Sequence, residues 1–127
     1  MKLRINGNSL RLRLSKTDVG KLLAEGRVED TVFFGPEQSA CLTYALEHEA
    51  ASKLIDFRYG SQRAAVVVSS AEATRWASGD QVGIYGEVDT GRGLLTLSVE
   101  KDFACLDQND ADNADTFPNP KADKVCQ

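Results

Sequence analysis

The sequence predicts an α+β domain that is rich in β-structure, with eight strands and two short helices. Apolar and polar residues alternate over several short stretches, a pattern typical of strands that bury one face. Two stretches with helical spacing each follow a serine that can cap a helix. This order of hairpin, helix and hairpin occurs twice, in residues 1–49 and 54–102. We therefore expect two ββαββ pseudo-repeats that share one core and form a barrel-like fold.

The first hairpin should span residues 3–14. Leucine or isoleucine occupies alternate positions in segments 3–5 and 10–14, and the positions between them hold Arg4, Arg11 and Arg13. The two segments are separated by Asn6-Gly7-Asn8, and asparagine and glycine tolerate the positive φ that tight turns need. The pattern predicts a hairpin with one leucine-rich face and one face that carries the three arginines.

A short helix should follow this hairpin. Ser15 can accept a hydrogen bond from the backbone N–H of Asp18, and Asp18 completes a variant of the capping box. Apolar residues at helical spacing predict that one side of the helix faces the core. Gly26 should end the helix, because glycine can take the left-handed conformation there. Strands should follow at about residues 31–34 and 41–47.

The second half repeats these features at an offset of 54 residues (58 − 4 and 69 − 15), so that Arg58 takes the place of Arg4, and Ser69 that of Ser15. Trp76 lies at helical spacing and is expected in the core. Segment 64–68 is apolar at every position, which is typical of a strand covered on both faces. The alternative to a duplication is that the two halves resemble each other by chance.

Length and composition favour a single domain over residues 1–127. The chain is 42% hydrophobic, and two separate domains of about 50 residues would each be marginally stable. No apolar run approaches the length of a membrane span, and no apolar signal segment follows Lys2 and Arg4, so we expect a cytoplasmic protein without a membrane partner. The three cysteines lack metal-ligand spacing, and their odd number favours reduced thiols.

Residues 103–127 form a tail with no counterpart in the first half. The apolar run Phe103-Ala104-Cys105-Leu106 should dock on the body, and Phe117-Pro118-Asn119-Pro120 supplies an aromatic anchor that we expect to fold back on the sheet. Segment 107–115 is rich in aspartate and asparagine, which is typical of a solvated and partly flexible acidic loop. It lacks the glycine and the closing glutamate of a calcium-binding loop.

Gly7-Asn8-Ser9, Arg13, the helix that ends at Gly26, and Asp30-Thr31-Val32 together resemble the swapped-hairpin domains of the AbrB/MazE type. In the second half, segment 66–69 and Gly79-Asp80-Gln81-Val82 resemble the same pattern. Those families are DNA-binding antitoxins and transition-state regulators whose half-barrels pair as dimers, and related double-psi barrels carry both halves on one chain. The resemblance implies a swapped-hairpin or double-psi-like barrel and leaves a homo-oligomer open.

The chain as a whole also resembles a family of short uncharacterised bacterial proteins. Members of that family share the opening Met-Lys-Leu-Arg-Ile strand with its Gly-Asn-Ser turn, the run Glu-Lys-Asp-Phe-Ala-Cys-Leu at residues 100–106, and Phe-Pro-Asn-Pro at residues 117–120. This second resemblance spans nearly the whole chain and implies no known function.

The candidate binding residues centre on the arginine-bearing strand face. Clustered guanidinium groups suit phosphates and carboxylates, which favours a site for an anion or a nucleic acid. The AbrB/MazE resemblance implies that Arg4, Asn8, Ser9 and Arg13 approach DNA. The full candidate set is Arg4, Asn8, Ser9, Arg11, Arg13 and Arg58. The alternative is an ordinary solvated strand face, balanced by carboxylates across the sheet at Glu29, Glu47 or Glu49.

Catalytic chemistry finds less support in the sequence. His48 is the only histidine, which excludes a histidine-centred metal cluster, and its acidic neighbours predict a surface position. No glycine-rich loop that could cradle a phosphate is present. Four carboxylates near predicted strand ends could instead form an acid–base site: Asp56, Glu87, Glu100 and Asp102. We expect no metal and no cofactor.

The sequence therefore favours a non-catalytic binding protein whose partner is a nucleic acid or an acidic protein. The formal charge is −4, from 15 basic and 19 acidic residues, so binding to phosphates requires that the charges be segregated. Much of the excess acid lies in segment 107–115, which leaves room for a basic face elsewhere. Two alternatives stay open: an enzyme with a carboxylate-based site in a barrel groove, and a purely structural or protein-interaction module.

Overall fold

A computed structural model describes residues 1–50, 53–103 and 115–117. This part of the chain contains eight strands and two helices, as the sequence predicts. In chain order they are β1 (Lys2–Ile5), β2 (Ser9–Leu14), α1 (Lys16–Glu25), β3 (Arg27–Phe33), β4 (Cys41–Glu49), β5 (Ile55–Gly60), β6 (Arg63–Ser69), α2 (Ser70–Ser78), β7 (Gly83–Asp89) and β8 (Leu94–Lys101). The fold is therefore a β-rich α+β fold.

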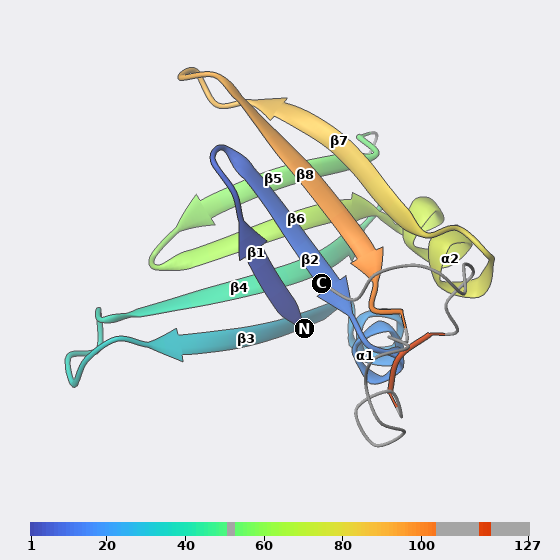
Figure 1. The fold of residues 1–127 in the computed structure, drawn as a ribbon, viewed down its shortest axis with the longest axis horizontal. Coiled ribbons are helices and arrows are strands. Elements are labelled where there is room, and N and C mark those ends of the chain that lie inside the picture. The colour runs from blue at the N-terminus through green and yellow to red at the C-terminus, as the bar shows by residue number, and fades with distance from the viewer. Residues whose placement is uncertain (51–52, 104–114, 118–127) are drawn as a thin grey trace.

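The strands form two four-stranded sheets, with the orders β1-β2-β8-β7 (the first sheet) and β3-β4-β6-β5 (the second sheet). Each sheet combines one hairpin from the first half of the chain with one from the second half. The central pairs β2–β8 and β4–β6 are parallel, and the outer pairs are antiparallel. In Figure 1 the strands of the first sheet run diagonally across those of the second, and both helices lie at one end.

The expectation of a barrel is wrong, because each described sheet keeps two edge strands: β1 and β7 in one, β3 and β5 in the other. The sheets approach each other closely at β5 and β7, where a Cβ atom built on Gly86 would clash with Cγ2 of Ile55. On the opposite side, the Met1 amine lies 2.9 Å from a carboxylate oxygen of Asp18 and 3.4 Å from one of Asp30. Packing and ion pairs thus join two open sheets.

Helix α1 has the ends that the sequence predicts. Ser15 Oγ accepts a hydrogen bond from the Asp18 N–H at 3.2 Å, and the Asp18 carboxylate accepts one from the Ser15 N–H at 3.1 Å. At the other end Gly26 has φ +82°, and its N–H donates to the Leu22 carbonyl at 2.9 Å. The capping box and the glycine stop are both confirmed.

Helix α2 begins in the same way and ends differently. Ser69 Oγ accepts from the Glu72 N–H at 3.2 Å, so the predicted cap is confirmed. Gly79 at the far end is extended, with φ −113°, where α1 ends in the left-handed conformation. Trp76 is fully buried, as expected, and its indole N–H donates to the Val82 carbonyl at 3.0 Å, so the buried donor has an acceptor.

One hydrophobic core lies between the sheets and draws on both halves of the chain. Leu12 on β2 and Val66 on β6 belong to the same cluster, together with Leu22 of α1 and Trp76 of α2. Strand β6 is buried on its other face too: Ala65 is 1% and Val67 is 3% exposed. Their neighbours on that outer face include the longer side chains of Glu47, Asp56 and Arg58 on β4 and β5.

The described residues of the tail, Phe103 and 115–117, contact the end of β8 and each other. The Phe117 N–H donates to the Asp102 carbonyl at 2.8 Å, and the rings of Phe103 and Phe117 meet edge to face with centroids 6.3 Å apart. The expected burial of Leu106 and the acidic loop at 107–114 lie outside the described residues. No helix of the described chain is long and apolar enough to cross a membrane.

Candidate anion-binding surface

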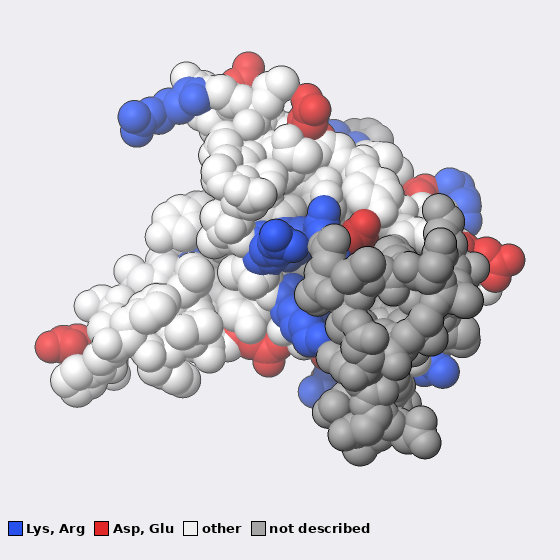
Figure 2. All heavy atoms as spheres, in the orientation of Figure 1, with Lys and Arg blue, Asp and Glu red and all other residues white. Residues whose placement is uncertain are grey.

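Four cationic side chains gather on the outer face of the first sheet. The register of β1 and β2 sets Arg4 directly opposite Arg11, and Lys2 directly opposite Arg13. Directly opposed residues share a face, with Cβ atoms about 4.5–5.5 Å apart. We call Lys2, Arg4, Arg11 and Arg13 the basic face. Figure 2 shows basic side chains gathered over β1 and β2 in the middle of this side of the molecule.

Two carboxylates border the basic face on the side of β8. Glu100 Oε1 lies 3.4 Å from Arg11 Nε and 3.9 Å from Arg13 Nε, and Asp102 lies 3.0 Å from Lys2 Nζ. Glu100 also accepts a hydrogen bond from the Tyr85 hydroxyl at 2.7 Å. Burial makes the largest contribution, and this bond to a carboxylate the next largest, to raising the pKa of Tyr85 to about 12. Four cations against the two carboxylates that contact them leave this group of six side chains net positive.

The turn between β1 and β2 uses its polar groups within the chain. Asn8 Nδ2 donates to the Leu94 carbonyl at 2.7 Å, and Ser9 Oγ donates to the Asn6 carbonyl at 3.0 Å. The Thr96 N–H also donates to the Asn8 carbonyl at 3.1 Å. Asn8 therefore holds the hairpin against the start of β8, and Ser9 closes the turn between β1 and β2.

Arg58 does not join the other candidate residues. It lies on β5 of the second sheet, and its guanidinium forms a bidentate pair with Glu49, with Nη1 3.2 Å from Oε2. The bond and the charge of Glu49 raise the pKa of Arg58. The carboxylates proposed as balancing the arginine face also lie on the second sheet, where Glu29 and Glu47 pair with Arg63.

The four carboxylates considered for an acid–base site are not brought together. Asp56 lies on β5 of the second sheet, whereas Glu87 and Glu100 lie on the outer face of the first sheet. Asp102 follows the end of β8 and pairs with Lys2. Within residues 1–50, 53–103 and 115–117, no group of three histidine, cysteine or acidic side chains could hold a metal ion.

The expectation that His48 lies on the surface is wrong. The side chain is half-buried on the inner side of β4, where Nδ1 lies 2.8 Å from the hydroxyl of Ser70 at the start of α2. Nε2 is buried and has no hydrogen-bond partner among the described residues. The alternation along β4 could have predicted this position, because His48 shares its parity with the buried Leu46.

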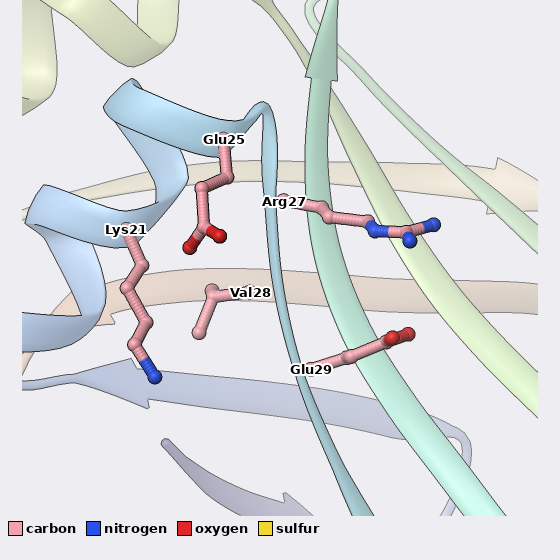
Figure 3. Close-up of a pocket in the computed structure, with 5 residues that line it drawn as sticks. All are labelled: Lys21, Glu25, Arg27, Val28 and Glu29. Atoms are coloured by element: carbon pink, nitrogen blue, oxygen red, sulfur yellow. The ribbon is translucent and has the colours of Figure 1, made fainter.

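A groove of about 230 Å³ lies between α1 and β3. Lys21 and Glu25 on the helix and Val28 on the strand point toward it, whereas Arg27 and Glu29 point to the other side of β3 (Figure 3). The groove is open and holds one lysine and one glutamate with a single apolar side chain. Small-molecule sites are usually larger, concave and mostly apolar, so this groove is not a candidate site.

Sequence reasoning missed two contacts that hold the tail near the basic face. Asp115 Oδ1 accepts hydrogen bonds at the N-terminus of α1, from the Thr17 N–H at 3.1 Å and the Thr17 hydroxyl at 3.0 Å. Bonds to Ser15 and Thr17 lower the pKa of Asp115. Lys101 is 6% exposed, and its ammonium donates to the Gly79 carbonyl at 2.7 Å and lies 5.4 Å from the Phe117 ring centroid. Burial lowers the pKa of Lys101.

Comparison with known proteins gives a family and no activity. No curated protein and no solved structure matches the chain. A family model described as "Family of unknown function (DUF7009)" matches residues 1–121. The match covers the opening strand, both helices, both sheets and the docked Phe117, so the chain belongs to the DUF7009 family, whose function is unknown.

Proposed function

We propose that this protein is a non-catalytic binding protein that holds a nucleic acid through the basic face. The supporting observation is the register of β1 and β2, which sets arginine opposite arginine and lysine opposite arginine on one face. Like charges placed directly opposite each other destabilise a sheet. A polyanion would offset that repulsion, and its phosphate oxygens would accept hydrogen bonds from the three planar guanidinium groups.

The arrangement of the hairpins supports a relation to swapped-hairpin proteins of the AbrB/MazE type. The order hairpin–helix–hairpin occurs in each half, and each sheet takes one hairpin from each half. We include in this proposal that the halves are pseudo-repeats derived by duplication, and that the β1–β2 hairpin is the nucleic-acid-facing element. The two capping serines, Ser15 and Ser69, stand at equivalent places and support the duplication.

Binding of this kind acts on the phosphate backbone. Arginines on a strand face provide charge and forked donors, and phosphate contacts position a protein without specifying sequence. Each neutralised phosphate releases counterions, so the affinity should fall steeply as the salt concentration rises. We therefore expect binding to duplexes of different sequence with similar affinity.

The test is a fluorescence-anisotropy titration of labelled duplex DNA at low salt, repeated at several salt concentrations, with a sulfated polysaccharide as competitor. Arg13→Ala and Arg11→Ala should each weaken binding and each reduce the slope of log affinity against log salt by about 1. Arg92→Ala, at an exposed turn away from the basic face, is the matched control and should leave both quantities unchanged.

Arg58→Ala tests whether the candidate residues chosen from the sequence, which include Arg58, or only those on the basic face bind DNA. Arg58 lies on the second sheet with Glu49, so its removal should leave DNA affinity unchanged. The proposal fails if the wild-type protein binds no DNA at low salt, or if Arg92→Ala weakens binding as much as Arg13→Ala does. Binding to the polysaccharide without binding to DNA would assign the basic face to another acidic partner.

A further inference from the structure

Strand β3 is an edge strand whose two halves differ. It pairs with β4 along one side only, and every residue in it except Val28 is exposed. Its first half carries Glu29 and Asp30, charges of the kind that block pairing between sheet edges. The second half ends in Val32 and Phe33, followed by Phe34, which are 40%, 76% and 70% exposed.

Other parts of the chain also contact the first half of β3. Val28 faces α1 across the groove of Figure 3, and the Met1 amine lies 3.4 Å from Asp30. The second half extends away from the helices with the β3–β4 hairpin (Figure 1). The surface of the projecting hairpins at the left of Figure 2 is mostly uncharged. An apolar, unblocked edge therefore begins at about Thr31.

We propose that two copies of this chain pair through this segment, β3 against β3 in antiparallel orientation, about a twofold axis at Val32. Val32 then lies opposite Val32 of the second copy, and Thr31 opposite Phe33. The two second sheets become one continuous eight-stranded sheet. The contact is isologous, because the same patch serves both copies and the pairing closes at the dimer.

A second copy fits this edge because the segment is complementary to itself in this register. An axis at Asp30 would set two aspartates opposite each other, which is unfavourable. An axis at Thr31 would set Glu29 opposite Phe33 and Asp30 opposite Val32, so both carboxylates would be desolvated. The axis at Val32 pairs Val32 with Val32 and Thr31 with Phe33, and it places Asp30 opposite Phe34, just past the end of β3. It therefore sets one carboxylate opposite an apolar residue, where the axis at Thr31 sets two, and it leaves Glu29 outside the apolar pairing. Edge pairing also satisfies the backbone groups that an exposed strand leaves to water.

The inner face of the second sheet adds apolar area beside this edge. Val32 lies opposite Leu42 on β4, and Tyr59, which is 70% exposed, lies on β5 at the far edge of the same sheet. Leu42 is only partly buried, so this strip still faces solvent in one copy. Pairing at β3 brings the same strip of the second copy next to it.

The test is the mass of the full chain in solution, measured by light scattering and by sedimentation across a range of concentrations. The wild-type protein should approach a mass of twice 13.8 kDa as the concentration rises. Val32→Lys would set two ammonium groups opposite each other and should weaken association by about tenfold or more. Leu94→Lys is the matched control, since Leu94 is 56% exposed at the start of β8, and it should dimerise like the wild type.

A disulfide tests the register independently. Directly opposed residues in an antiparallel pair bring their Cβ atoms close enough for a bridge, so Val32→Cys should form a linked dimer on mild oxidation, with a 32–32 peptide found by mass spectrometry. Leu94→Cys should give no comparable link. The proposal is overturned if the wild type is a monomer at every concentration. It is equally overturned if the dimer persists in Val32→Lys, or if oxidised Val32→Cys contains no 32–32 peptide.

Discussion

The outer faces of the two sheets carry similar residues in opposite arrangements. On the second sheet Arg58 and Arg63 meet carboxylates: Arg63 lies 3.1 Å from Glu29 and also pairs with Glu47, and Arg58 is paired with Glu49. On the first sheet the register of β1 and β2 sets Arg4 opposite Arg11. The second sheet has an outer face whose charges are largely neutralised within the chain, whereas the basic face concentrates charge of one sign.

This difference shows why residue type alone is a poor guide to a binding surface. The sequence pattern matched Arg58 with Arg4 at an offset of 54 residues, yet the two lie in different sheets with different neighbours. Arg58 already donates hydrogen bonds to Glu49, which neutralises its charge and favours a structural role for it. On the basic face four cations exceed the two carboxylates that contact them, and this excess favours a role toward a partner.

The two outer faces rest on one core, and the largest effect should come from breaking it. Leu12 is 2% exposed beneath the basic face and shares a cluster with Val66 of the second sheet. Leu12→Ala should lower the free energy of unfolding by about 2–5 kcal/mol, through lost burial and a cavity. Chemical denaturation measures the loss. Leu94→Ala, at an exposed site, should change it by no more than about 0.5 kcal/mol.

The second-largest effect should come from disturbing the contact between the two sheets at β5 and β7. Gly86→Ala would place a Cβ against Ile55 and should cost about 1–3 kcal/mol, because one strand must shift away from the other. Ile55→Ala removes the clashing Cγ2, so the double variant should lose less stability than the sum of the two single losses. Losses that simply add in the double variant would show that the two sheets are not in contact at this point. Thermal and chemical denaturation of the three variants provide the measurement.

The arginines of the two faces should differ in what they contribute to stability. Arg63→Ala removes a half-buried side chain that pairs with two carboxylates, and it should cost about 1 kcal/mol. Arg11→Ala loses a longer contact with Glu100 but relieves the repulsion with Arg4, so it should lie within about 0.5 kcal/mol of the wild type. Equal losses in chemical denaturation would remove the contrast between the two faces.

The smallest effect concerns Glu100, the carboxylate that links the basic face to Tyr85. The pKa of Tyr85 is raised to about 12, so the folded state keeps this proton longer than the unfolded state does. The resulting stability is fully present below the ordinary pKa near 10, and it is lost as the pH rises from there toward 12. Ultraviolet titration should show a late tyrosine that disappears in Tyr85→Phe and titrates earlier in Glu100→Gln. A late tyrosine that survives Tyr85→Phe would assign the shift to another residue.

Local chemistry by itself determined the elements and their ends. Ser15, Ser69 and Gly26 act on groups within a few residues, so the capping of both helices and the stop of α1 could be predicted from the sequence. Alternation likewise predicted the β1–β2 hairpin and the shared face of Arg4, Arg11 and Arg13, because side chains on a strand change face at every residue.

Only the tertiary structure decided which hairpins share a sheet, since that choice depends on contacts between residues far apart in the sequence. It paired β2 with β8 and β4 with β6, which separated Arg58 from Arg4 and left two open sheets where a barrel was expected. It also brought Asp115 to the start of α1 and buried Lys101 beneath Phe117. Neither contact has a periodic signature, because a tail residue that binds a distant helix end or lysine leaves no local pattern. The sequence gives the identity of Asp115, Lys101 and Phe117, but packing between distant parts of the chain decides which groups they contact.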